Sequence, residues 1–452
     1  MLLAENLAMR SVCFKIVIVV VVGLSGIVWA VGMEAEFELR DTNYMEEVKG
    51  IKLYNPALIN DRPVWIMGDV PQRLILEFDW LGEEVRIFEY SIHHCRGDWS
   101  ALSPLSLSEY SSGFAYEEIE GYSFSFNTKV PYVHYSVEWT DQTVPWTKSG
   151  NYVLAVWDVT TGERKLCFTR RFFVVEPLVE VEAYKVLPRG RVPHHAYQAF
   201  ELSIDLEEIE LFSPLRYVYI NVYQNMRWDM GIEGLRPLTE RGTLLVYEGQ
   251  RQIVFPGLKE YRRLDMRSMK WRSNELVRIA ATDTGYVLVL RRQQPRYYQQ
   301  SRGLPDRNGS FFFDNFDYRH EGFLRLEYAE VYFNLSAWRE SDYDVYVTGG
   351  YWGWSLLPEM KMQYDEGRNA YFLRTRLKQG YYDYGFVAVD RRTGARDVMR
   401  IDGSTDKTEN AYFIFVYYSD PTQNYDRIIA AVRYDYWSGS MELYEARVRI
   451  RR

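Results

Sequence analysis

The stretch YVLAVWDVTTGERKLCFTRRFFVVE, residues 152–176, decides the fold that this sequence predicts. Two runs rich in Val, Leu, Phe and Trp flank the short loop TTGER at residues 160–164. β-Branched and aromatic side chains suit the half-buried, pleated surface of a strand, and a short loop that contains glycine suits a hairpin. The stretch therefore predicts two antiparallel strands that lie side by side.

Runs of the same kind precede this hairpin. RLILEFDW (73–80), VRIFEYSIHHC (85–95) and YVHYSVEW (132–139) are separated by turn residues such as Gly82 and Gly97. Short strands at this spacing are typical of a β-sandwich. We therefore expect residues 33–177 to form a first β-sandwich domain.

Strand patterns continue to the end of the chain. AFELSIDL and RYVYINVYQ lie in a second unit, residues 178–324, and AYFIFVYY lies in a third, residues 325–452. A polar stretch at residues 292–316, broken by Pro and Gly, reads as the loop between them. The sequence therefore predicts a mainly β protein of three consecutive immunoglobulin-like β-sandwich domains.

The composition favours a strand-rich fold, and the net charge argues against a nucleic-acid partner. Aromatic residues make up 16% of the 452 residues, which favours strands over helices. The formal net charge is -8, so the chain repels polyanions and nucleic acid is not an expected partner.

The N-terminal residues 1–32 have the pattern of an export signal peptide. Arg10 and Lys15 precede an apolar run from Ile16 to Val31, which ends in small residues. The alternative is a membrane anchor, but the run is shorter than the roughly 20 residues that a membrane span needs. We expect a cleaved signal and no span in the exported chain.

The stretch SIHHCRGDWS, residues 91–100, crowds two histidines, a cysteine and an aspartate together. In a strand, alternate side chains face opposite sides, so His93 and His94 cannot both ligate one ion. A zinc site would need His93, Cys95 and two distant ligands, and neither a CxxC nor an HExxH motif occurs. We interpret the stretch as a strand that enters a turn, and predict no metal and no cofactor.

The mature chain keeps two cysteines, Cys95 and Cys167, since Cys13 lies in the predicted signal. Export permits a disulfide, so either one bridge forms in the first domain or both side chains are buried as small apolar groups. No GxSxG elbow, P-loop or glycine-rich dinucleotide loop is present, and the sequence predicts no catalytic residues.

The third unit carries the candidate binding residues. In VYVTGGYWGW, residues 345–354, a strand runs into paired glycines and then into Tyr351, Trp352 and Trp354. This pattern is similar to the early-set immunoglobulin-like modules that accompany starch- and glycogen-handling enzymes, where aromatic faces stack on sugars. The three residues are our candidate surface for a glycan, with an exported carbohydrate-binding protein as the alternative function. The competing interpretation is that these rings fill the sandwich core.

An ordered set of motifs resembles the plug protein family of the bacterial type IX secretion system. The motifs are IHHCRGDW (92–99), YSFSFNTKVPYVHYSVEW (122–139), SGNYVLAVWD (149–158), TRRFFVVEP (169–177), QNMRWD (224–229), EYRRLDMRS (260–268), LKQGYYDYGFV (377–387) and DGSTDKTENAYFIFVYY (402–418). The resemblance extends from about Val48 to the C-terminus.

The resemblance implies a non-enzymatic protein of the periplasm, at the inner face of the outer membrane. Its implied partner is the large outer-membrane β-barrel translocon, whose periplasmic side it would seal while the channel holds no substrate. Ile92, His94, Cys95, Asp98 and Trp99 match the family motif. That match implies a structural role for the histidine-rich stretch.

Overall fold

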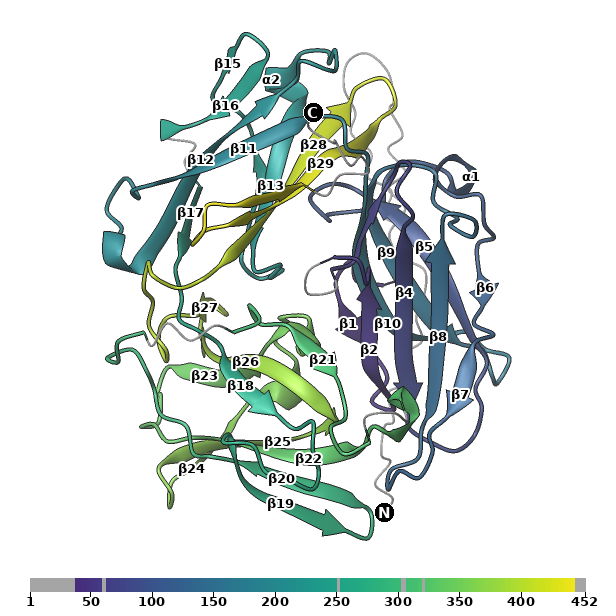
Figure 1. Ribbon diagram of the computed structural model, residues 1–452, viewed down its shortest axis with the longest axis vertical. Coiled ribbons are helices and arrows are strands. Elements are labelled where there is room, and N and C mark those ends of the chain that lie inside the picture. Colours follow the sequence, from purple (N-terminus) through teal and green to yellow (C-terminus); the bar gives the residue numbers. More distant parts are fainter. Residues whose placement is uncertain (1–36, 59–61, 250–252, 302–305, 319–321, 444–452) are drawn as a thin grey trace, which may run out of the picture.

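The computed structural model describes residues 37–58, 62–249, 253–301, 306–318 and 322–443. The export signal predicted for residues 1–32 lies outside the described residues. Regular structure in the described part is mostly strand (Figure 1), and the prediction of a mainly β protein is confirmed. The helical turns are short: α1 (Leu107–Tyr110), η1 (His194–Ala196), α2 (Pro214–Tyr217), η3 (Phe323–Arg325), η4 (Gly350–Trp352) and η5 (Pro358–Met360).

Two sheets form a first sandwich. One has the order β1-β10-β9-β5-β6, with β3 beside β10, and the other has the order β2-β4-β8-β7. The predicted hairpin is present as β9 and β10, which pair antiparallel from Asp158 opposite Lys165 to Gly150 opposite Val174. The strands are β1 (Thr42–Asn43), β2 (Val48–Tyr54), β3 (Val64–Ile66), β4 (Arg73–Trp80), β5 (Phe88–Cys95), β6 (Glu117–Glu118), β7 (Tyr122–Phe124), β8 (Val133–Thr140), β9 (Gly150–Asp158) and β10 (Lys165–Val175).

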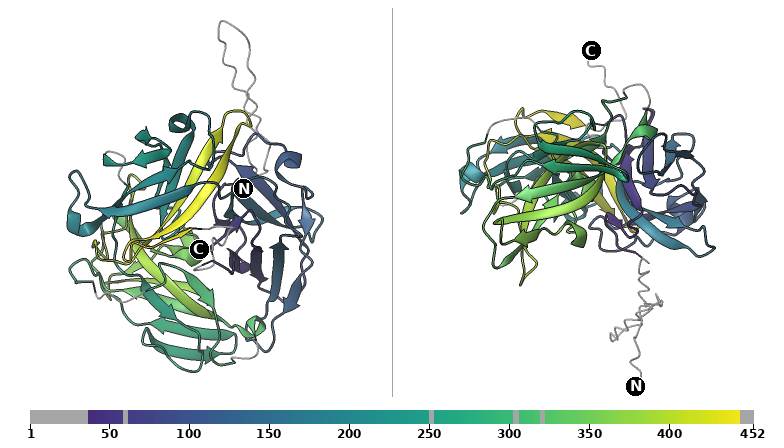
Figure 2. Two further views of the ribbon diagram at one scale, coloured as in Figure 1. Left: turned by 45° about the horizontal axis from the view of Figure 1, so that its top comes forward. Right: turned by 90° about the horizontal axis from the view of Figure 1, so that it is seen from below.

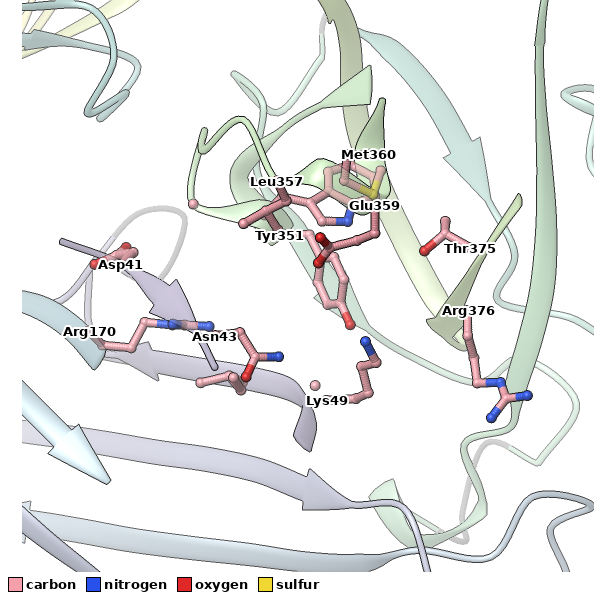
Figure 3. A pocket seen from close by; sticks show the side chains of 14 residues that line it. Asp41, Asn43, Lys49, Arg170, Tyr351, Leu357, Glu359, Met360, Thr375 and Arg376 are labelled. Atoms are coloured by element: carbon pink, nitrogen blue, oxygen red, sulfur yellow. The ribbon is translucent and has the colours of Figure 1, made fainter. Parts of the chain in front are cut away.

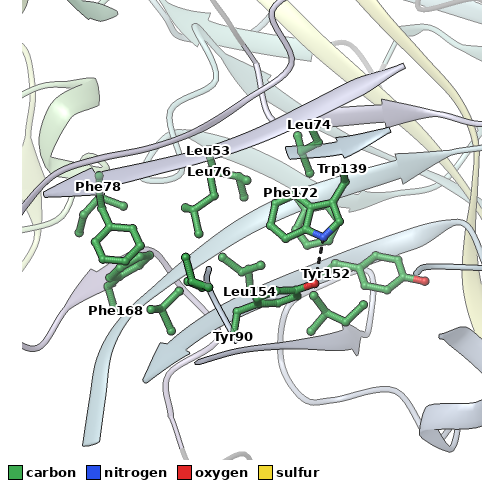
Figure 4. Close-up of a cluster of buried hydrophobic side chains, with 14 of the residues drawn as sticks. Leu53, Leu74, Leu76, Phe78, Tyr90, Trp139, Tyr152, Leu154, Phe168 and Phe172 are labelled. Carbon is green, nitrogen blue, oxygen red and sulfur yellow. Dashed lines mark hydrogen bonds between the residues drawn. The ribbon is translucent and has the colours of Figure 1, made fainter. Parts of the chain in front are cut away.

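The core of the first sandwich combines aromatic rings with aliphatic side chains (Figure 4). Phe78 stacks on Tyr135 with ring centroids 5.2 Å apart. Trp139 Nε1 donates a hydrogen bond to Tyr90 Oη at 3.2 Å, so its only polar atom is satisfied inside the core. Burying each side chain of this size stabilises the fold by about 1.5–3 kcal/mol.

A second sandwich joins strands from both ends of the remaining chain. Its first sheet has the order β11-β12-β16-β15, with β17 beside β12, and its second has the order β14-β13-β28-β29-β30. The strands are β11 (Glu180–Val186), β12 (Tyr197–Asp205), β13 (Val218–Gln224), β14 (Gly231–Leu235), β15 (Thr239–Arg241), β16 (Leu244–Tyr247), β17 (Ile253–Pro256), β28 (Ala411–Asp420), β29 (Tyr425–Asp435) and β30 (Met441–Leu443).

A third sandwich is built from the chain between β17 and β28. In one sheet β26 pairs with β18, β21, β23 and β27, and the facing sheet has the order β19-β20-β22-β25-β24. The strands are β18 (Arg262–Asp265), β19 (Leu276–Thr282), β20 (Gly285–Leu290), β21 (Phe311–Phe313), β22 (Tyr328–Leu335), β23 (Tyr343–Thr348), β24 (Gln363–Asp365), β25 (Ala370–Lys378), β26 (Gly380–Asp390) and β27 (Arg396–Asp397).

The sheets do not follow the predicted boundary between residues 324 and 325. β18 and β20 pair with strands on the far side of that boundary, and β28 pairs with β13. The sequence pattern could not show this pairing, because the pattern of a strand depends on neighbouring residues, whereas its partner strand can lie far away in the sequence. We propose that the chain consists of three sandwich domains, with the third inserted into the second; the immunoglobulin-like assignment stays a prediction.

The three sandwiches surround a common centre, as Figures 1 and 2 show from different sides. The first and second meet at an apolar interface, here called the first–second joint. In it Phe173 of β10 stacks on Phe415 of β28 at 3.9 Å between centroids, and Trp99 packs edge-on against Phe173 and Trp228. Trp99 thus places the histidine-rich stretch at this joint.

Gly97 fits this joint because it has no side chain. Its N–H donates to Asp426 Oδ2 at 2.9 Å, and its carbonyl accepts from Asn221 Nδ2 at 2.7 Å. A Cβ on Gly97 would lie 1.9 Å from Tyr219 Oη, and Tyr219 is itself stacked on Tyr417. The RGDW turn therefore docks the first sandwich on the second.

We predict that Gly97→Ala destabilises the protein, because the new Cβ overpacks the first–second joint. Overpacking of this kind costs about 1–3 kcal/mol, which urea unfolding measures. Gly367→Ala is the matched control, since a Cβ there would meet only Asp365 Oδ1 at 3.4 Å. Equal unfolding midpoints for the two variants would contradict this view of the joint.

Candidate functional site

The predicted binding residues lie in the turn that follows β23. Tyr351 and Trp352 belong to η4, and Trp354 follows with a φ of 59°. Trp352 is 8% exposed and Trp354 is 3% exposed, while Tyr351 is half-buried. The structure thus places these rings inside the molecule, and they form no exposed platform for a sugar. Alternation and neighbouring glycines alone could not reveal this burial.

Trp354 helps to join the second and third sandwiches. The Arg227 guanidinium lies 4.3 Å from the centroid of its ring, and Tyr261 packs against it at 5.5 Å between centroids. Gly309 approaches so closely that a Cβ there would lie 2.3 Å from the indole. We call this contact the second–third joint.

A buried charge network completes the second–third joint. Asp229 pairs with Arg227 at 2.8 Å and with Arg396 of β27 at 2.9 Å. Burial raises the pKa of Asp229, but the two guanidinium groups outweigh burial and the net shift is downward. The carboxylate therefore stays charged and holds two sandwiches together.

Asp41 touches all three sandwiches. From the first sandwich, its Oδ1 accepts the Arg171 backbone N–H at 2.8 Å. Its Oδ2 accepts from Trp228 Nε1 of the second at 3.0 Å, and its carbonyl accepts from Ser355 Oγ of the third at 3.3 Å. No single-sequence pattern marks Asp41, because its partners lie far away along the chain.

The first and third sandwiches meet around Asp79, at what we call the first–third joint. Lys378 Nζ lies 2.6 Å from Asp79 Oδ2, and the two side chains are 1% and 0% exposed. Tyr328 Oη donates to the same oxygen at 2.5 Å, and His134 Nδ1 lies 2.8 Å from Oδ1. Burial raises the pKa of Asp79, but Lys378 and His134 outweigh it and lower the pKa overall.

Small cavities remain between the first and third sandwiches. Figure 3 shows one of about 60 Å³, lined by Lys49, Arg170, Tyr351 and Glu359 among others. Sites for small organic ligands typically have about 300–1,000 Å³. The cavity in Figure 3 is much smaller and is packing space within a joint.

The histidine-rich stretch makes structural contacts. His93 Nε2 lies 2.9 Å from Ser91 Oγ, and His94 Nε2 lies 3.1 Å from the Ser149 carbonyl oxygen. Burial lowers the pKa of each histidine to about 4. Within the described residues, no group of three or more His, Cys, Asp or Glu side chains is placed to hold a metal ion.

The geometry defines a β protein of several sandwiches, in which Asp41, Asp79 and Asp229 form bonds between the sandwiches. Residues 48–176 match the family of the type 9 secretion system plug protein 1st domain. The family resemblance seen in the sequence is thus confirmed over these residues, which span most of the first sandwich.

A solved structure of a hypothetical protein from Parabacteroides merdae is similar to this chain. The similarity covers 88% of this chain and 100% of that protein, with 26% sequence identity and a TM-score of 0.82. It therefore extends well beyond the plug domain. Comparison with curated proteins gives no match.

We predict that Lys378→Met destabilises the protein by about 3–5 kcal/mol, because it leaves the Asp79 carboxylate buried and without its cation. Asp79→Asn combined with Lys378→Met should recover most of this loss. Arg164→Met is the control, since the Arg164–Glu89 pair is exposed and such pairs contribute about 1 kcal/mol or less. Urea unfolding measures all three variants.

The same variants report on acid stability. The folded pKa of Asp79 is below its ordinary value of 3.8, so its stabilising effect is complete above that value and is lost as the pH falls through the folded pKa. The native protein should therefore lose stability below about pH 4 more steeply than the double variant. Parallel acid curves would count against a charged Asp79.

We also predict that neither Cys95 nor Cys167 reacts with iodoacetamide in the folded protein. Both are free and buried, and burial raises the pKa of each thiol. Both should be alkylated in urea without any reductant, as peptide mass spectrometry can show. A requirement for reductant would reveal a disulfide instead.

Proposed function

We propose that this protein is a non-enzymatic periplasmic plug of the type IX secretion system. It would bind and seal the periplasmic side of the outer-membrane translocon barrel while the channel holds no substrate. The match of residues 48–176 to the plug domain carries this proposal. That family is structural, which agrees with the lack of a catalytic motif in the sequence.

The architecture supports closure by shape. Three sandwiches, each on the order of 30 Å across, lie around one centre and make a broad body (Figure 2). Buried contacts at the first–second, first–third and second–third joints hold the body rigid. A rigid body of this width can obstruct a wide opening without any bond-making chemistry.

The proposed location is the periplasm, at the inner face of the outer membrane. In the described part of the chain, no helix has the length and apolar character needed to cross a bilayer. We propose that binding to the translocon holds the protein at the membrane. Channel opening requires release, so a moderate and reversible interface is expected.

Three exposed aromatics offer a contact surface, here called the β7 stripe. Tyr122, Phe124 and Phe126 are 49%, 53% and 60% exposed, and β7 is the last strand of its sheet. Residues 121–128 contain neither a charge nor a proline, although natural edge strands usually carry such protection. We propose that the β7 stripe packs against the periplasmic rim of the barrel.

The proposed function predicts that the tagged protein recovers a large β-barrel protein from solubilised outer membranes. Tyr122→Ser combined with Phe124→Ser should reduce this recovery several-fold and lower the melting temperature only slightly, because about half of each side chain is exposed. Trp271→Ser with Trp338→Ser is the control, since these exposed tryptophans lie in the third sandwich. Absence of any barrel from the native protein's eluate would refute the plug.

The alternative of a carbohydrate-binding protein rested on an exposed Trp352 and Trp354. Their burial removes that basis, because a ring must present an open face to stack on a sugar. No other described feature favours it.

A further inference from the structure

A cavity of about 380 Å³ opens on the third sandwich, and none of its lining residues belongs to the β7 stripe. Its walls come from the chain around β18, from Glu275 just before β19, from the segment 291–300 that follows β20 and from Asp306. Unlike the small spaces in the joints, it has the volume of a ligand site, which is typically about 300–1,000 Å³.

The cavity gathers positive charge in a chain whose net charge is -8. Three carboxylates line it, from Glu260, Glu275 and Asp306. Against them stand six cations, from Lys259, Arg262, Arg263, Arg291, Arg292 and Arg296. An excess of cations in a recess attracts anions more strongly than isolated surface charges do.

Half of these cations build the walls. Arg262 pairs with Asp402 at 2.5 Å and donates to Gln293 Oε1 at 2.6 Å. Arg296 also reaches Asp402, at 3.0 Å, and Lys259 Nζ donates to the carbonyls of Arg296 and Gln299. These side chains fix the segment 291–300 against β18.

The other three cations are available to bind a ligand. Arg263, Arg291 and Arg292 are exposed, and none of them forms an ion pair with any described residue. Arg291 Nε donates to the Asn274 carbonyl at 3.1 Å and Arg292 Nη2 donates to the Arg368 carbonyl at 2.7 Å. Each guanidinium has five N–H donors, so most of theirs are unused.

We propose that this cavity binds an acidic peptide segment of a partner protein, with at least two carboxylates held by Arg263, Arg291 and Arg292. A guanidinium fork matches a carboxylate in two parallel hydrogen bonds, and three forks call for more than one carboxylate. Gln294, Gln299 and Gln300 also line the cavity. Their amides can both donate to and accept from a peptide backbone.

The proposal concerns a different surface from the β7 stripe, and it does not depend on the sealing of the barrel. A peptide segment can enter the cavity and contact its arginines, whereas the headgroups of a flat bilayer would contact few of them. An acidic segment is therefore the occupant that charge and shape favour.

The test uses the full chain and a fluorescein-labelled hexaglutamate peptide, followed by fluorescence anisotropy at low salt. We expect saturable binding that weakens with salt and exceeds binding of hexaglutamine. Arg291→Gln with Arg292→Gln should weaken the affinity at least about tenfold, since hydrogen bonds between charged groups are the strong ones. The melting temperature should not change, because both side chains are exposed.

Arg374→Gln with Arg376→Gln is the matched control. These arginines also stand near each other on one strand, but both pair with Glu330. The two control substitutions should leave the affinity for the peptide unchanged. An equal loss in both double variants would overturn the proposal in favour of unspecific attraction.

Two further results would also overturn it. Inorganic phosphate that displaces the peptide at equal concentration would reveal a site for a small anion, and binding to phosphatidylglycerol vesicles in preference to the peptide would reveal a lipid site. Recovery of the barrel by the Arg291→Gln, Arg292→Gln protein is scored separately. Failure of peptide binding would therefore not contradict the plug function, which the recovery of the barrel tests.

Discussion

The rest of the structure depends on the antiparallel pairing of β13 with β28. This ladder joins residues 218–224 to residues 412–418, and both strands are buried along almost their whole length. The entropic cost of closing a loop grows only slowly with its length, so buried pairing can offset it even over such a separation. Because β28 returns to β13, the third sandwich is held to the second at both of its ends.

That closure brings three joints together, and two kinds of interaction hold them. Stacked rings such as Phe173 and Phe415 dominate the first–second joint, and apolar contact of this kind has little directional preference. The Asp79–Lys378 pair and the Asp229 network fix the other two joints, since sliding would separate buried charges. Apolar contact thus supplies stability, and the charged pairs supply a unique arrangement.

The conspicuous motifs of the sequence are used in these contacts between sandwiches. The aromatic turn at Trp354 and the glycine of the RGDW turn both serve contacts between sandwiches. The groups left available lie elsewhere, in the β7 stripe and in the arginines around the cavity. A protein that acts through its surface has its recognition chemistry in such side chains, which the fold itself does not need.

The strands could be predicted from the sequence with good fidelity in the first sandwich. The hairpin of residues 152–176 formed as expected because the periodicity of a strand and the chemistry of a short turn are local properties. The ordered motifs likewise pointed to the plug domain that residues 48–176 match. The candidate site was harder, since an aromatic residue beside glycine has the same local pattern whether it is buried or exposed.

By itself, then, the sequence determined the β character of the chain, its first hairpin and its family resemblance, all of which rest on neighbours in the chain. Only the tertiary structure decided that β28 completes the second sandwich, that Trp352 and Trp354 are buried, and that arginines from β18 and from the segment after β20 share one cavity. These features depend on contacts between residues far apart in the sequence, which no local pattern encodes.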